Sequence, residues 1–159
     1  MNDLPMIFRK ALKSEINIVL DICNEIKKTY PFWDDEYPIY DNFLESFKED
    51  GLYVLEVNNE IVGSISFEYG TLESKDAMTL SRFMVKIGYR KNGYGKVIFE
   101  ELEKEILNRN IKKIEFLVHK DHPFAFKMYQ NFGYQDQGIY ETEWDDGDPH
   151  YHLFTKTLN

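Results

Sequence analysis

The apolar residues near the start of the chain are spaced as in one strand followed by two helices. Residues 5–9 read as a strand. From residue 16 to residue 26 the apolar positions recur every three or four residues, which predicts a helix with Ser14 as its N-cap and its end near Tyr30. Asp41 is expected to cap a second, shorter helix. Between the two helices we expect an irregular loop rich in aromatic residues.

The middle of the chain has the pattern of an antiparallel hairpin. Residues 52–57 and 61–67 are strand-like runs, and Asn58-Asn59 between them favours a tight turn. A longer loop then leads to a further predicted strand at residues 77–85.

The second half of the chain alternates strands with helices. Its predicted elements are, in order, a helix at 92–108, a strand at 113–118, a helix at 123–131, and strands near 134–140 and 151–158. Pro123 suits the first turn of a helix, and Gly133 suits the end of one. Together the two halves predict a mixed α/β chain that forms a single domain over residues 1–159.

Composition narrows the class of protein. A chain of 159 residues with 43% hydrophobic residues can bury a sizeable core, and no apolar stretch is long enough to cross a bilayer. Cys23 is the only cysteine, which rules out an internal disulfide framework and favours a reducing, cytoplasmic location. The net charge of −9 argues against nucleic-acid binding.

The acidic residues gather in two segments, at residues 34–41 and 141–148. One interpretation is that they only keep the protein soluble. The other is that they form an acidic rim that attracts a cationic substrate.

One long stretch of this acidic chain contains basic residues but no acidic ones. No carboxylate lies between Asp76 and Glu100, and the stretch contains Arg82, Lys86, Arg90, Lys91 and Lys96. A turn with two glycines follows a strand-like run there and precedes a helix-like one. Such a turn directs backbone N–H groups, a helix N-terminus and positive charge at one point, which suits a ligand that carries phosphate.

Two common phosphate-binding motifs fit this turn poorly. A Walker loop needs a longer glycine spacing and a hydroxyl residue after the lysine, but Val97 follows Lys96. A dinucleotide-binding fold needs a third glycine beyond Gly95, with two residues between them, and this chain lacks it.

The segment Arg90-Lys91-Asn92-Gly93-Tyr94-Gly95 resembles the Arg/Gln-x-x-Gly-x-Gly/Ala signature of the GCN5-related N-acetyltransferases. Residues 125–134 resemble the Ala-x-x-x-Tyr-x-x-x-Gly-Phe segment of the same family. The strand end at 83–85 lies at the family's usual distance from the arginine. Two positions depart from the pattern, because Ile87 replaces a frequent proline and His122 replaces a frequent asparagine.

The resemblance implies an acetyl-CoA donor and a mostly antiparallel central sheet that splays between two parallel strands and is flanked by helices. The parallel strands would be those of residues 77–85 and 113–118, and a backbone N–H near Met84 or Val85 would polarise the thioester carbonyl. The residues expected to bind the cofactor are Phe83, Met84, Val85, Arg90, Lys91, Asn92, Gly93, Tyr94, Gly95, Lys96, His122 and Ala125.

Acetyl transfer to an amine needs a proton acceptor for the amine and a proton donor for the leaving thiolate. The resemblance makes Tyr129 the general acid, although a tyrosine there could also be a core aromatic. Glu68 and His150 are candidate bases, the first acting through water. No metal is expected, because no histidines cluster with cysteines or carboxylates at a typical ligand spacing.

The acceptor is expected to be an amine of a small molecule, a peptide or a protein, and to be cationic. Trp33 and Tyr37 could cover it by cation–π contact, or could simply pack their loop onto the core. Two other functions stay open, a non-catalytic acyl-CoA sensor of the same fold and a nucleotide-binding module. Analogy with the family also allows a homodimer.

Overall fold

The computed structural model describes residues 4–143, 145 and 147–159. Asp146, in the second acidic segment, lies outside the described residues. The chain forms two compact units, of which the first combines Met1–Glu68 with Arg82–Lys104 and the second combines Tyr69–Ser81 with Glu105–Asn159.

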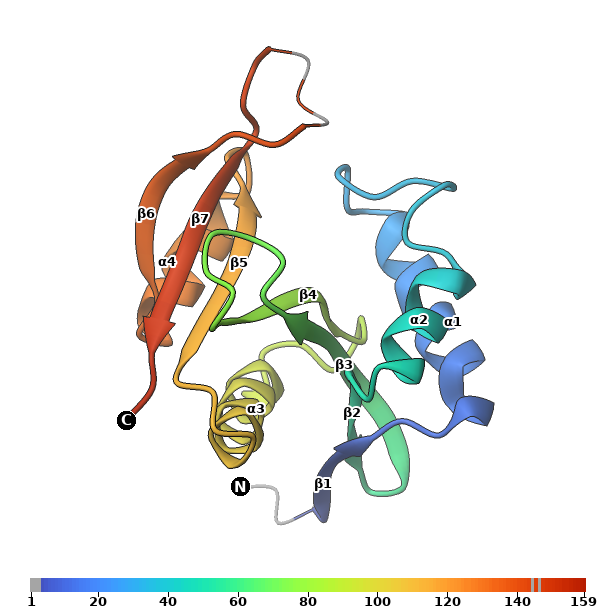
Figure 1. Cartoon of the computed structure of the whole chain (residues 1–159). Coiled ribbons are helices and arrows are strands. Elements are labelled where there is room, and N and C mark those ends of the chain that lie inside the picture. The colour runs from blue at the N-terminus through green and yellow to red at the C-terminus, as the bar shows by residue number, and fades with distance from the viewer. Residues whose placement is uncertain (1–3, 144, 146) are drawn as a thin grey trace. The chain divides into compact units, whose positions relative to one another are not determined.

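The first unit contains an antiparallel sheet and two helices that pack side by side (Figure 1). Its elements are β1 (Met6–Lys10), α1 (Ile16–Lys27), α2 (Tyr40–Lys48), β2 (Leu52–Val57) and β3 (Glu60–Tyr69). β2 pairs with β1 on one side and with β3 on the other. Asn58 and Asn59 have φ angles of 50° and 67°. The predicted hairpin is thus confirmed, with the left-handed turn residues that such hairpins favour.

The start of α1 differs from the prediction. Ser14 lies inside a short 3₁₀ helix, Lys13–Glu15, that precedes α1. The Leu12 backbone N–H donates to Oε1 of Glu15 at 2.7 Å, so the glutamate satisfies an amide at the helix start. The expectation that Ser14 caps this helix is therefore wrong.

The start of α2 differs in the same way. Asp41 lies within its first turn, and the Ile39 backbone N–H donates to Oδ1 of Asn42 at 2.8 Å. Glu15 thus bonds back to the Leu12 amide from the 3₁₀ helix that precedes α1, and Asn42 bonds back to the Ile39 amide from inside α2.

The core of the first unit gathers the apolar face of α1, Phe43 of α2 and the inner positions of the sheet. Phe43 is fully buried, and its replacement by alanine should cost about 3–5 kcal/mol. Cys23 is fully buried in the same cluster, and burial raises the pKa of its thiol. It therefore packs as a small apolar side chain.

Strand β4 (Met78–Val85) begins in the second unit and ends in the first, where α3 (Tyr94–Asn108) follows it. The buried positions of α3 are Tyr94, Ile98, Phe99, Leu102 and Ile106. This spacing of three to four residues is the amphipathic pattern that the sequence predicts.

The second unit contains β5 (Lys113–His119), α4 (Pro123–Asn131), β6 (Gln135–Tyr140) and β7 (Tyr151–Thr157), shown in orange to red in Figure 1. β7 pairs antiparallel with both β5 and β6. The start of β4 pairs parallel with β5 through two residue pairs, Met78 with Ile114 and Thr79 with Glu115.

The seven strands have the hydrogen-bonded order β1-β2-β3-β4-β5-β7-β6. The predicted mixed sheet, mostly antiparallel with one parallel pair and flanked by helices, is confirmed.

Candidate functional site

The turn between β4 and α3, residues 86–96, is called the glycine turn below. Its start is fastened to β3, since the Lys86 backbone N–H donates to the Val62 carbonyl at 2.7 Å. The Glu60 carboxylate accepts hydrogen bonds from Nζ of Lys86 at 2.8 Å and from Oη of Tyr89 at 2.6 Å. These two bonds lower the pKa of Glu60 and raise those of Lys86 and Tyr89. The positive charge of Lys86 is therefore used to hold the turn in place.

The middle of the glycine turn is shaped by left-handed backbone and by one side chain. Lys91 and Gly93 have φ angles of 67° and 79°. The Asn92 side-chain amide donates to the carbonyls of Tyr89 at 3.0 Å and Arg90 at 3.3 Å. Asn92, predicted to bind the cofactor, thus uses its side-chain amide to close the turn.

The end of the glycine turn presents the first turn of α3. The Val97 backbone N–H donates to the Gly93 carbonyl at 3.2 Å, which is the first helical bond. The amides of residues 94–96 precede that bond and have no acceptor within the helix. They are the kind of N–H groups that bind an anion at a helix N-terminus.

The two glycines serve different purposes. Gly93 needs its left-handed φ, and a Cβ added there would meet nothing within 4 Å, so the space beside it is open. A Cβ at Gly95 would lie 3.1 Å from Cζ of Phe83, so glycine lets α3 approach β4 closely. The open space, the amides of the first helical turn and the nearby cations all fit a diphosphate such as that of coenzyme A.

Only part of the predicted cation cluster lies at this point. Arg90 and Lys91 are exposed in the turn, and Lys96 is exposed with Nζ 3.8 Å from the Glu100 carboxylate. The other two cations of the stretch have partners elsewhere, since Lys86 pairs with Glu60 and the side chain of Arg82 contacts Tyr37. The cations predicted to bind the cofactor are Arg90, Lys91 and Lys96.

At the strand end, residues 83–85, a ligand could contact mainly backbone groups rather than side chains. Met84 is buried in the core of the first unit, and the ring of Phe83 packs edge-on against Phe99, with 5.0 Å between centroids. Nε of Arg90 donates to the Val85 carbonyl at 3.4 Å. Tyr94 is also buried, so of the predicted binding residues Met84 and Tyr94 can contribute only main-chain groups.

The loop between α1 and α2, residues 31–39, is called the aromatic loop below. Trp33 packs against the core, with its ring edge-on to Tyr30 at 5.0 Å between centroids. Oδ1 of Asp34 accepts the backbone N–H groups of Glu36 at 2.8 Å and Tyr37 at 3.1 Å. Tyr37 remains 41% exposed. Of the two predicted acceptor-binding residues, Trp33 thus anchors the loop and Tyr37 is presented on it.

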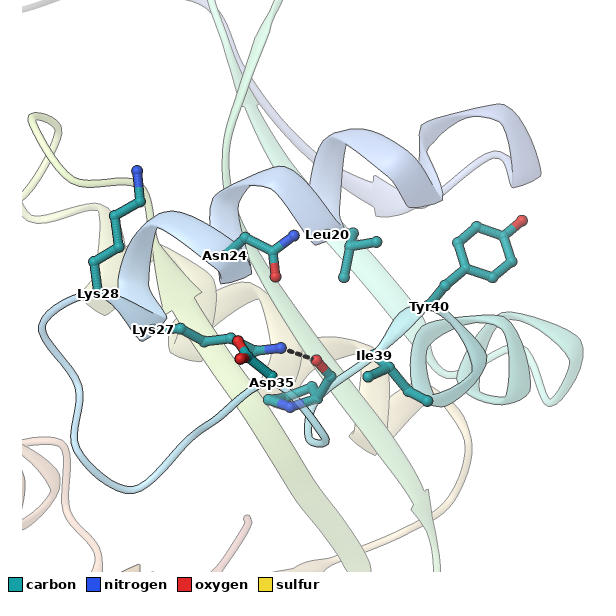
Figure 2. Close-up of a pocket in the computed structure, with 8 residues that line it drawn as sticks. Leu20, Asn24, Lys27, Lys28, Asp35, Ile39 and Tyr40 are labelled. Atoms are coloured by element: carbon teal, nitrogen blue, oxygen red, sulfur yellow. Dashed lines mark hydrogen bonds between the residues drawn. The ribbon is translucent and has the colours of Figure 1, made fainter.

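A pocket of about 480 Å³ lies beside the aromatic loop, on the outer side of α1. Lys27 and Pro38 both line it, and Nζ of Lys27 donates to the Pro38 carbonyl, a bond drawn as a dashed line in Figure 2. Its other lining residues are Leu20, Asn24, Lys28, Asp35, Ile39 and Tyr40. Neither Trp33 nor Tyr37 lines this pocket, so it is separate from the predicted acceptor residues.

The predicted general acid, Tyr129, lies on α4 in the second unit. Its ring is half-buried and packs edge-on against Phe116 of β5, with 4.6 Å between centroids, and more loosely against Phe154 of β7. The aromatic cluster thus holds the ring of Tyr129 in a defined orientation.

His122 and Ala125, also predicted to bind the cofactor, form the start of α4. His122 is the N-cap residue, and its carbonyl accepts the Ala125 backbone N–H at 3.1 Å. Ala125 is buried.

The two candidate bases belong to different units. Glu68 is an exposed residue near the end of β3. His150 directly precedes β7, and its ring stacks on His119 with 5.7 Å between centroids and 6° between planes. Burial lowers the pKa of His119. The stacked neighbour is thus held mainly neutral at physiological pH.

In the described part of the chain, no group of three or more histidine, cysteine or acidic side chains is arranged to hold a metal ion. Across the same residues, every helix is too short or too polar to span a membrane.

Comparison with known proteins connects these features to one family. The sequence pattern described as Acetyltransferase (GNAT) family matches residues 19–134. An acetyltransferase of Yersinia pestis (strain Pestoides F) is 29% identical over 86 residues, which are 53% of this chain and 57% of the relative. The chain thus spans little more than half the length of the curated relatives that it matches.

Solved structures share the fold over nearly the whole chain. Ard1 from Thermoplasma volcanium has a TM-score of 0.78 at 15% identity, with 97% of this chain and 98% of that chain covered. The protein yncA from Salmonella typhimurium, solved with its cofactor acetyl-CoA, has a TM-score of 0.76 at 16% identity, with 97% and 94% covered. At such identities the likeness shows the fold alone.

Proposed function

The chain belongs to the acetyltransferase (GNAT) family, and from this premise we propose that it moves an acetyl group from acetyl-CoA to a primary amine. The observation that carries the proposal is the glycine turn. Its left-handed Gly93, the open space beside that residue, the amides of residues 94–96 and the exposed Arg90 and Lys91 match the needs of a diphosphate. The acetyl-CoA of the Salmonella neighbour is consistent with this donor.

In the proposed reaction the neutral amine attacks the thioester carbonyl carbon directly. A C–N bond forms and the C–S bond breaks. The amine proton passes to a base or to water, because an unperturbed alkyl amine has a pKa of about 10 and is protonated at neutral pH. Glu68 and His150 remain the candidate bases.

We propose that Oη of Tyr129 donates a proton to the departing thiolate. The assignment rests on the correspondence of Tyr129 with the family's tyrosine and on the packing that fixes its ring against Phe116. A phenol is suited to this step because its pKa of about 10 keeps it protonated until the thiolate forms.

The test measures thiol release from acetyl-CoA with a panel of primary amines. Tyr129→Phe should lower kcat by about a hundredfold or more, in line with the loss of a general acid, while coenzyme A affinity changes little. Tyr134→Phe is the matched control, since the Tyr134 ring packs on the same Phe116 at 5.0 Å. Equal rates for the two variants would remove Tyr129 from the mechanism.

The same assay separates the alternatives. Coenzyme A binding without turnover on any amine would favour an acyl-CoA sensor. Stabilisation of the protein by ATP or NAD, but not by coenzyme A, would favour a nucleotide-binding module.

A further inference from the structure

Arg82 has an unusual backbone for a strand residue. It lies inside β4 with a φ angle of 51°, in the left-handed region. A residue other than glycine is sterically strained in this conformation. Residues held in such conformations by their surroundings gather at active sites and ligand sites.

The guanidinium of Arg82 is positioned by three side chains of the first unit. Nη1 donates to Oη of Tyr37 at 3.0 Å, and Nη2 donates to Oγ of Ser46 at 2.7 Å. The group lies over the ring of Phe43, 5.6 Å from its centroid. Both hydrogen-bond acceptors are neutral hydroxyls, so neither of them neutralises the charge.

The Nε atom of this guanidinium is buried, and among the residues that the structure describes no acceptor reaches it. A buried donor on a charged group is costly without a partner. A carboxylate in place of the two hydroxyls would accept from Nη1 and Nη2 and pair the charge of the guanidinium, while the buried Nε stays outside this contact.

The position of Arg82 connects the two functional segments of the first unit. It directly precedes residues 83–85, where the family resemblance places the thioester. Its partner Tyr37 comes from the aromatic loop, which is expected to receive the acceptor. An anionic group bound to Arg82 would therefore lie within a few residues' length of the reacting acetyl group.

We propose that Arg82 binds a carboxylate of the acceptor, so that the acceptor is an amino-acid-like molecule with an amine and a carboxylate a few carbons apart. This inference rests on the proposed acetyltransferase function and narrows its substrate class. It replaces a net cationic acceptor by a zwitterionic one. In the absence of the acceptor, the hydroxyls of Tyr37 and Ser46 hold the Arg82 guanidinium in position.

The experiment compares acceptor pairs that differ only in the carboxylate. Free α-, β- and γ-amino acids are each paired with the corresponding amide, and kcat/KM is measured for both members by thiol release from acetyl-CoA. The wild type should prefer at least one acid over its amide. Arg82→Met should lower that acid-to-amide ratio by about tenfold or more, as expected for one lost charge-assisted pair. Because the ratio is compared between variants, the intrinsic reactivity of each amine cancels.

Three further variants separate carboxylate binding from a merely structural role. Asparagine suits the left-handed backbone, so Arg82→Asn keeps the test valid if the methionine variant does not fold. Its acid-to-amide ratio of kcat/KM should fall as far as that of Arg82→Met. Ser46→Ala removes a hydroxyl partner but keeps the charge, so it should retain the preference for the acid. Lys104→Met removes an exposed cation of α3 and should leave the ratio unchanged.

The inference is overturned if the amides are the better acceptors, if Arg82→Asn keeps the wild-type ratio, or if Ser46→Ala loses it equally. It is also overturned if no acid of the panel is acetylated or shifts the melting temperature of the coenzyme A complex. Failure of the proposed function is recognised separately, because the wild type would then not bind coenzyme A in a calorimetric titration.

Discussion

The glycine turn and the aromatic loop are both irregular segments of the first unit, yet they present different groups. The glycine turn, held by side-chain bonds of Glu60 and Asn92, presents backbone, with Lys91 and Gly93 left-handed and the helix amides following at once. The aromatic loop gets its shape from side chains, with Asp34 bonding two amides and Tyr37 meeting an arginine 45 residues away.

The difference follows from the ligands proposed for them. A diphosphate is recognised by N–H groups that every residue carries, so a short motif suffices to build its site. An acceptor is recognised by particular side chains, which must be brought together from distant parts of the chain. The two segments should therefore respond differently to mutation, and the predictions below test that contrast.

The largest effect is expected from Gly93→Val. A β-branched residue at a φ of 79° strains the turn and fills the space beside it, so coenzyme A affinity should fall by about tenfold or more. Gly138→Val is the matched control, because Gly138 has a φ of 95° and equally open surroundings in the second unit. Both variants should melt earlier, but isothermal titration should show the loss of affinity only at Gly93. Equal affinities would mean that the turn does not hold the donor.

A moderate effect is expected from Asp34→Ala. The loss of an acceptor for two backbone amides should loosen the aromatic loop by about 1 kcal/mol and raise KM for the amine several-fold. Coenzyme A affinity should not change. Asp35→Ala removes the neighbouring acid and should have the smaller effect on KM. A change in coenzyme A affinity instead would contradict the separation of the two segments.

The smallest effect concerns pH. The folded protein holds the pKa of Glu60 below its usual value through Lys86 and Tyr89, so this contribution to stability is fully present above the usual glutamate pKa of about 4.3. It is lost as the pH falls through the lower, folded pKa. Urea unfolding between pH 7 and pH 3 should therefore show a slightly steeper loss of stability for the wild type than for Glu60→Gln. Parallel curves would mean that Glu60 does not anchor the glycine turn.

The sequence predicts the fold and the glycine turn for the same physical reason. Period-two and period-3.6 apolar spacing and the glycine motif are local signals, and each of the predicted helices and strands is found within a few residues of its expected bounds. The reversed helix starts at Glu15 and Asn42 are a partial exception, since Ser14 and Asp41 were equally good candidates by residue type.

The arrangement of side chains could not be predicted in the same way. Arg82 is indistinguishable in sequence from the cations of the glycine turn, and only its left-handed backbone and its contacts with Tyr37 and Ser46 separate it. Glu60 gives no signal either, because its two partners lie 26 and 29 residues further along the chain. Such pairings depend on tertiary structure, which local patterns do not encode.

Calorimetric titration of coenzyme A into the wild type and Arg90→Glu tests the central claim most directly. If the glycine turn binds the diphosphate, the wild type binds with one site per chain. The charge reversal should then weaken binding about tenfold at low ionic strength, with the difference shrinking as salt is added. Absence of binding to the wild type, or equal affinity of the two proteins at low salt, would contradict the account.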